Sequence, residues 1–198
     1  MGDLVYLSIS SLDGYIDDPD GGFEWAEPTA ELHRFVNELQ RGVTTQLLGR
    51  GTYEVMLWWD DMGASDPDDP GLGTDVDPAM EAAAEEFGEI WRATDKIVYS
   101  TTLERSEMSR SRLERTFDLD AVRRLKAEST GDLAIGGARL AAQAITAGLV
   151  DEFQLVLNPV IVGGGTPSLP EGTRLDLELV EQRLFDGGAV FLRYRARR

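Results

Sequence analysis

Three short segments rich in glycine and hydroxyl side chains contain the residue types that bind phosphate groups. Backbone N–H groups, hydroxyls and guanidinium groups are suitable donors to phosphate oxygens. Glycine lets the backbone approach a ligand closely, and a helix that begins there adds unpaired N–H groups and the positive end of its dipole. The segments are Gly49-Arg50-Gly51-Thr52, Ser100-Thr101-Thr102 and Gly136-Gly137-Ala138-Arg139.

Each segment by itself is also compatible with an ordinary turn, so its meaning depends on its place in the fold. None contains the Gly-x-Gly-x-x-Gly pattern, and an ordinary Rossmann domain is therefore not indicated. Arg50 and Arg139 have an alternative role as surface ion-pair residues. If the strands before the segments are neighbours, three such turns at one sheet edge could hold a single extended anion.

Strands that alternate with helices are expected to position these segments. Apolar and β-branched runs predict strands at 4–10, 43–48, 96–100, 133–135 and 153–162, and Asp186-Gly187-Gly188 predicts a hairpin between 177–185 and 189–195. Apolar spacing predicts helices near Pro28, after Gly49, from Pro78, and over 119–128 and 138–147. This order predicts a single domain over 1–198 with a three-layer α/β/α fold, a mostly parallel central sheet and a C-terminal antiparallel hairpin.

Composition narrows the class of protein. The formal net charge of −17 argues against nucleic acid as a partner, because its phosphates would be repelled. The absence of cysteine excludes disulfides and thiolate chemistry. No apolar stretch approaches the ~20 residues that span a bilayer, and the N-terminus lacks a secretory signal, so we expect a cytoplasmic protein without a membrane partner. The acidic segment 62–78 is expected to be a flexible loop; the acidic loops lack metal-ligand spacing, so no metal site is predicted.

Taken in order, the motifs resemble the dihydrofolate reductase superfamily. The likeness rests on Asp13-Gly14-Tyr15-Ile16, the run 48–54, the run 96–100 and Ile135-Gly136-Gly137. The later run Gly148-Leu149-Val150-Asp151-Glu152, with Pro159 and Gly163-Gly164-Gly165, is similar to the C-terminal reductase domain of the bacterial bifunctional riboflavin deaminase-reductase. The resemblance covers nearly the whole chain and implies a stand-alone reductase domain with a dihydrofolate reductase-like fold.

This resemblance implies NADPH as the cofactor. In the family, the turn after the second strand contacts the NADPH phosphates, the hydroxyls after the third strand lie near the 2′-phosphate, and the glycine pair holds the pyrophosphate. The corresponding positions are Gly49, Arg50, Gly51 and Thr52; Ser100 and Thr101; and Gly136, Gly137, Ala138 and, by proximity, Arg139. The phosphate-binding residue types noted above agree with these roles.

For catalysis, the resemblance implies an acidic residue on the first helix that assists proton delivery. Folate-reducing members carry a Trp, a Pro and then the acid, and this chain has Trp25, Pro28 and Glu31. Glu31 has an alternative role, in which it complements the positive end of its helix. His33, two residues further on, lies on another side of that helix and is expected at the surface.

Asp13, Trp25 and Trp58 are the candidates for the substrate pocket, with core packing or an ordinary acidic turn as their alternatives.

The implied reaction is an NADPH-dependent reduction of a small organic substrate, resembling that of 5-amino-6-(5-phosphoribosylamino)uracil reductase in riboflavin biosynthesis. A dihydrofolate-type pterin reductase and a non-catalytic nucleotide-binding module are the alternative functions. No Lys or Arg occurs from Gly51 to Trp91, which favours a neutral substrate. The resemblance also implies a homodimer, with the strand 153–162 contributing to it.

Overall fold

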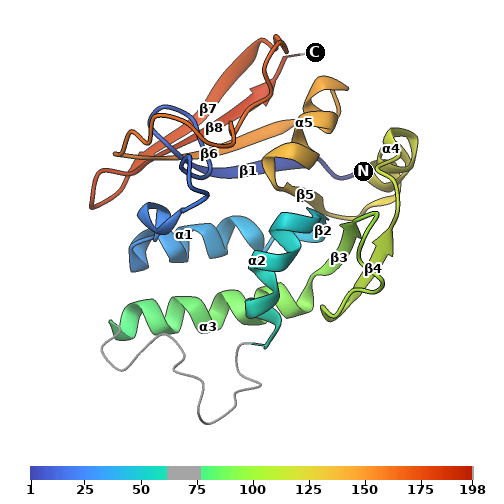
Figure 1. The fold of residues 1–198 in the computed structure, drawn as a ribbon, viewed down its shortest axis with the longest axis horizontal. Helices are drawn as coiled ribbons and strands as arrows, with labels where there is room; N and C mark the ends of the chain where they lie inside the picture. The colour runs from blue at the N-terminus through green and yellow to red at the C-terminus, as the bar shows by residue number, and fades with distance from the viewer. Residues whose placement is uncertain (62–76, 198) are drawn as a thin grey trace.

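A central mixed sheet organises the part of the chain that the computed structural model describes, residues 1–61 and 77–197 (Figure 1). Its eight strands within these ranges lie in the order β4-β3-β2-β5-β1-β6-β8-β7. They are β1 (Leu4–Ser11), β2 (Val43–Gly49), β3 (Asp95–Tyr99), β4 (Ser111–Glu114), β5 (Asp132–Gly136), β6 (Glu152–Asn158), β7 (Leu177–Leu184) and β8 (Val190–Ala196). From β4 to β6 in this sheet order, each strand is parallel to its neighbours, whereas β8 and β7 add an antiparallel hairpin at one edge.

Helices cover both faces of this sheet. They are α1 (Ala30–Gln40), α2 (Arg50–Asp61), α3 (Pro78–Ala93), α4 (Leu119–Glu128) and α5 (Ala138–Thr146), with a short 3-10 helix, η1 (Glu24–Ala26). Adjacent strand residues point to opposite faces, so Leu47 packs with α4 and α5 whereas Leu48 packs with α2 and α3. Helix α1 covers β6 and β8 on the same side as α3, and it runs alongside α3 (Figure 1). The predicted three-layer α/β/α fold is confirmed.

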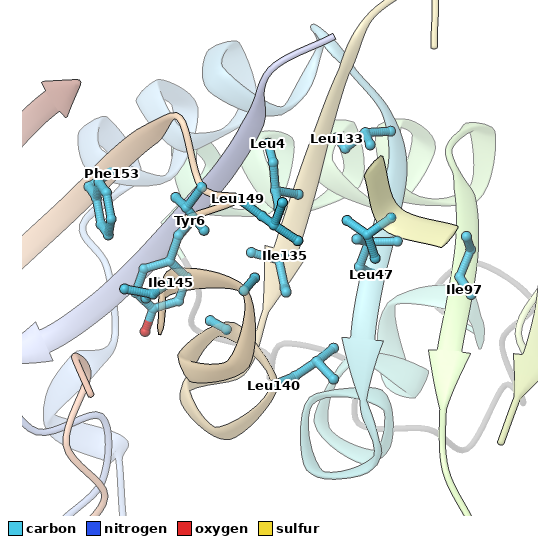
Figure 2. Packing of buried hydrophobic residues seen from close by; sticks show 14 residues of the cluster. Leu4, Tyr6, Leu47, Ile97, Leu133, Ile135, Leu140, Ile145, Leu149 and Phe153 are labelled. Carbon is cyan, nitrogen blue, oxygen red and sulfur yellow. The ribbon is translucent and has the colours of Figure 1, made fainter. Parts of the chain in front are cut away.

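The largest apolar cluster lies between the sheet and the helices α4 and α5. Figure 2 shows Leu47 and Ile135 on the neighbouring strands β2 and β5, and α5 contributes Leu140 and Ile145 to the same cluster. Each fully buried Leu or Ile contributes about 1.5–3 kcal/mol relative to an exposed side chain. This packing holds the strand β5 and the helix α5 in place on either side of the glycine pair.

Local capping signals explain where several helices begin. The Thr29 hydroxyl accepts a hydrogen bond from the Leu32 N–H at 3.3 Å and so caps α1. Asp77 caps α3 and is followed by Pro78 at the first helical position, where a missing N–H has no consequence. Asp118 caps α4 in the same way as Asp77 caps α3. These helix starts were accessible from sequence because the caps are local.

The structure departs from the sequence-based expectation at β4 and β6. The edge strand β4 was not predicted, since its alternating, half-exposed residues carry little apolar signal. The expectation of a strand over 153–162 was wrong at its end, because β6 stops at Asn158, before Pro159, which cannot donate to a ladder. Strand β6 also pairs with β1 on one side and β8 on the other, so it has no free edge for a second subunit.

Two further expectations concern the acidic segment and the membrane. Of the predicted acidic loop 62–78, residues 62–76 lie outside the described residues, and Asp77 and Pro78 begin α3. None of the helices in the described part of the chain has the length and apolarity needed to cross a membrane. That 1–198 forms one domain stays a prediction.

Candidate active site

The sheet order brings the three glycine- and hydroxyl-rich segments to one edge. They follow β2, β3 and β5, and these strands are neighbours in the order β3-β2-β5. Gly49 is paired with Tyr99, the residue before Ser100, and Leu48 is paired with Gly136. Because parallel strands end at the same edge, the segments that follow them lie side by side.

A cavity of about 570 Å³ opens at this edge of the sheet. Six of the residues predicted to contact the cofactor line it: Gly49, Gly51, Thr52, Gly137, Ala138 and Arg139. The strand β1 supplies another wall, and the loops after β1 and β6 supply a third through residues that include Asp17 and Thr166. Gly136 lines a second, adjacent cavity, and Arg50, Ser100 and Thr101 line neither.

The glycine pair allows the starts of α2 and α5 to approach each other. Gly137 has φ of +89°, and a Cβ added to it would lie 2.4 Å from the Thr52 Oγ1. A Cβ on Gly136 would lie 3.2 Å from both Leu48 Cδ2 and Thr52 Cγ2. Gly137 is also the N-cap of α5 and provides no side-chain hydrogen bond, so backbone N–H groups of the first turn have no side-chain partner there. The geometry leaves bare backbone at the cavity wall.

Arg50, Ser100 and Arg115 form a polar cluster beside the first cavity. Arg50 Nη1 donates to Thr102 Oγ1 at 2.5 Å, and Arg50 Nε donates to Glu54 at 2.7 Å. Ser100 Oγ accepts the Thr102 and Leu103 N–H groups at 3.3 and 3.1 Å, which holds the segment in a tight turn. Arg115 donates to the carbonyl oxygens of Ser100 and Leu103.

The role of Arg115 in this cluster was missed by sequence reasoning. It follows β4, the strand that the pattern did not reveal, so no motif linked it to Ser100. Thr101 is exposed beside the same turn. Two guanidinium groups from different parts of the chain thus converge on the segment 100–103.

A second cavity, of about 320 Å³, adjoins the first. The two share the wall residues Leu7, Ile9, Thr52 and Gly137. Most of the remaining lining is apolar or aromatic, and it also includes His33, Gln40 and Gln46. Gln46 Nε2 donates to Gln40 Oε1 at 2.7 Å, so these two amides already pair with each other. No Lys, Arg, Asp or Glu is among the described residues that line this cavity.

The expectation that His33 is a surface residue was wrong. It is 8% exposed and packs edge-on against Trp59 and Phe87, with ring centroids 5.6 and 5.7 Å away. Its Nδ1 lies 3.2 Å from Asn37 Oδ1. Burial lowers the His33 pKa below its ordinary value of 6.5, and the Asn37 hydrogen bond and the nearby Glu86 charge oppose that change. Helix α3 covers this side of α1, and the spacing of residues on α1 alone cannot reveal such a cover.

Glu31, the predicted catalytic acid, lies apart from both cavities. Its carboxylate accepts a hydrogen bond from Arg183 of β7 at 2.8 Å and lies 3.5 Å from the Asp186 N–H. The Arg183 hydrogen bond is the main reason that the Glu31 pKa is lowered. A carboxyl held in its charged form is the opposite of what a proton donor at neutral pH requires.

The three residues predicted for the substrate pocket line neither cavity. Asp13 accepts the backbone N–H groups of Val162 and Gly163 at 3.2 and 2.8 Å, and so it joins two loops. Trp25 lies in η1, with its Nε1 buried and unpaired among the described residues. Trp58 packs against Trp59 but points elsewhere, because successive helical residues are rotated by about 100°. The adjacent Trp59 is the one that lines the second cavity.

The sequence of this chain matches the model of a known protein family. The family model of the RibD C-terminal domain matches residues 4–191. The uncharacterized protein YyaP of Bacillus subtilis strain 168 is 28% identical over 188 residues, which cover 93% of this chain and 89% of that protein.

Two solved structures share the fold. A protein from Shewanella sp. PV-4, assigned provisionally to riboflavin biosynthesis, has a TM-score of 0.72 and 21% identity, with 99% of each chain covered. Dihydrofolate reductase from Enterococcus faecalis, complexed with NADP(H) and RAB-propyl, has a TM-score of 0.62 and 16% identity, with 100% of this chain and 98% of that chain covered. At these identities the likeness establishes the fold.

Proposed function

The chain belongs to the RibD C-terminal domain family, and on this premise we propose that it is an NADPH-dependent reductase that transfers hydride to a small organic substrate. The observation that carries the proposal is the pair of adjoining cavities. One is lined by six of the predicted cofactor-binding residues, and the other is mostly apolar and of a size suited to a small molecule. The Enterococcus faecalis relative was solved with NADP(H), which supports a nicotinamide dinucleotide as the cofactor.

The residues of the first cavity fit the diphosphate of such a cofactor. Gly137 and Ala138 line it at the start of α5, and Gly51 and Thr52 line it in the first turn of α2. Two helix N-termini and a backbone without a side chain at Gly137 suit an anionic group. Arg139 is the cation among the described residues of this wall, and it offsets part of the chain's negative charge there.

When bound, NADPH would supply the hydride, and the chain's own residues would hold the reactants and exclude water. The loop that follows β1 is fastened to the loop that follows β6. Leu12 N–H donates to the Val160 carbonyl at 2.7 Å, and Ile16 N–H donates to the Thr166 carbonyl at 2.9 Å. Ile16 and Thr166 both line the first cavity, so these bonds fix one of its walls.

The polar cluster of Arg50, Ser100 and Arg115 would bind the 2′-phosphate that distinguishes NADPH from NADH. Arg50 already donates to Thr102, and Arg115 supports the same turn through Ser100 and Leu103. A phosphate placed there would receive a charge-assisted hydrogen bond from Arg50, worth about 1.5–3 kcal/mol. Ser100 and Thr101 would position the phosphate by their place in the turn.

Substitution of Arg50 tests this assignment. We expect Arg50→Ala to weaken NADPH binding by about 10- to 100-fold and to leave NADH binding nearly unchanged, as measured by titration of tryptophan fluorescence. Arg123→Ala is the matched control, because both arginines are half-exposed and pair with an acid on their own helix. An equal loss of affinity for NADPH and NADH would remove Arg50 from the 2′-phosphate site.

The catalytic part of the proposal is tested by steady oxidation of NADPH in the presence of candidate carbonyl, imine and pterin substrates. Saturable NADPH binding with no oxidation by any of them would favour a non-catalytic nucleotide-binding module. We do not extend the proposal to the phosphorylated aminouracil of riboflavin biosynthesis. The second cavity has no Lys or Arg among its described lining residues to pair with a substrate phosphate.

The proposal includes a homodimer, formed through β7 in place of the strand expected from sequence. Strand β7 pairs with β8 and ends the described sheet, so its other edge is unpaired. It exposes Leu179, Val180 and Leu184, which are apolar and 48%, 52% and 71% exposed. An exposed apolar edge strand is a template for pairing with a second chain.

A further inference from the structure

The lining of the second cavity includes His33, and the hydrogen bonds of its neighbour Asn37 determine which imidazole nitrogen can accept a hydrogen bond. Asn37 is fully buried on α1, and its Nδ2 donates to the Ala83 carbonyl and to the Glu86 carboxylate, each at 2.8 Å. An amide nitrogen carries two hydrogens, and both are used by these bonds. The alternative orientation of the amide would turn its oxygen toward two other acceptors. The Asn37 amide therefore directs its oxygen, Oδ1, at His33.

This orientation determines the tautomer of His33. Asn37 Oδ1 can only accept, so the His33 Nδ1 at 3.2 Å carries the hydrogen and donates it. In the neutral imidazole the other nitrogen, Nε2, then has a lone pair and no hydrogen. No described residue forms a hydrogen bond with Nε2, and the imidazole lines the cavity. An acceptor is thus available to a bound molecule.

The surroundings of His33 restrict that molecule further. Trp59 and Phe87 contact the imidazole and line the cavity, and Trp91 stacks on Phe87. Aromatic walls favour a planar ring, which packs on them by its face or edge. A charged group would lose its hydration without gaining an ion pair, because the described lining has no charged side chain.

We propose that the second cavity binds an uncharged planar ring that carries an N–H or O–H group, and that this group donates its hydrogen to His33 Nε2. The inference rests on the proposed function, since it names the substrate class of the same site. It assigns His33 to substrate binding, whereas the sequence pointed to Glu31, on the same helix, as the catalytic acid. It also separates this chain from enzymes whose substrates carry a phosphate.

Three small probes test the proposal by calorimetric titration of the full chain without NADPH. They are quinazolin-4(3H)-one, which has a ring N–H; its N3-methyl derivative, which lacks this donor; and its 6-carboxylate, which adds a charge. We expect the first to bind and the other two to bind at least about 10-fold more weakly. The N3-methyl derivative loses the hydrogen bond to His33, and the carboxylate must lose its hydration. Equal binding of the first two, tighter binding of the carboxylate, or no binding by any probe would overturn the proposal.

Variants of His33 identify the atom that accepts. His33→Phe keeps a ring against Trp59 and Phe87 but has no acceptor, so it should bind the N–H and N-methyl probes equally. His33→Gln places an amide oxygen near the position of Nε2 and should restore part of the preference. Thermal unfolding establishes that each variant is folded. A folded His33→Phe protein that still prefers the N–H probe by the wild-type factor would show that another group accepts the hydrogen.

The probe experiment and the cofactor experiment fail separately. Discrimination among probes by a chain that does not bind NADPH would contradict the reductase and leave the ligand class intact. Normal NADPH binding with no discrimination among probes would contradict the ligand class and leave the cofactor site intact.

Discussion

The close approach of Gly137 and Thr52 gives the sharpest prediction about the first cavity, where we propose that the cofactor binds. A Cβ on Gly137 would lie 2.4 Å from Thr52 Oγ1 and 3.6 Å from Thr52 Cβ, and φ at Gly137 is +89°. Gly137→Ala therefore combines a strained backbone with a steric clash. Thr52 is β-branched, so its side chain has few rotamers into which it can retreat. The start of α2 must move away from the start of α5.

Gly148 provides a control that separates strain from clash. It also has positive φ, +65°, but a Cβ there meets no atom within 4 Å. For Gly148→Ala, left-handed strain of about 1–2 kcal/mol is partly offset by about 0.4–1 kcal/mol from a less flexible unfolded chain. We expect a net destabilisation of about 1 kcal/mol. Gly137→Ala should add about 1–3 kcal/mol for overpacking.

Urea denaturation of both variants measures these differences, and tryptophan fluorescence measures NADPH affinity. Gly137→Ala should lose affinity because the two helix starts are displaced, whereas Gly148→Ala should bind as the wild type does. The double variant Gly137→Ala/Thr52→Ala should regain most of the clash contribution to stability. If the two glycine variants were equally stable and bound NADPH equally well, the cavity wall would not depend on this contact, and the reasoning would be refuted.

Three other outcomes follow from single side chains. Glu31→Gln should leave the rate of NADPH oxidation within about twofold of wild type, since Glu31 pairs with Arg183 outside both cavities. A large loss in kcat would instead support Glu31 as the catalytic acid. Because the folded-state pKa of His33 is lowered, its contribution to stability is full above pH 6.5 and is lost as pH falls through the folded-state pKa. In urea unfolding, the free energy of unfolding of His33→Phe should therefore fall less at acid pH than that of the wild type. Identical pH profiles for the two proteins would contradict the burial of His33. Leu184→Lys should yield a monomer by light scattering, whereas Ile161→Lys, in a loop and also 71% exposed, should not; an unchanged mass for both would reject the β7 dimer.

The sequence by itself determined most of the helices and strands and the glycine- and hydroxyl-rich turns. Thr29, Asp77 and Asp118 mark helix starts through bonds to their own neighbours, and apolar patterning marks the strands that precede the turns. The glycine pair could be recognised because a backbone with positive φ needs glycine locally. These signals span a few residues, so they can be read without the fold.

Only the tertiary structure decided which side chains line the second cavity. Glu31 is directed away by Arg183, which lies 152 residues further along the chain, and His33 is covered by Phe87 of α3. Arg115 reaches Ser100 from a strand too weakly patterned to predict. The environment of a side chain depends on what packs against it from distant parts of the chain, and helical spacing gives only its direction relative to its own helix. For that reason the sequence indicated the turns that line the first cavity, and the fold decided that His33 and not Glu31 lines the second.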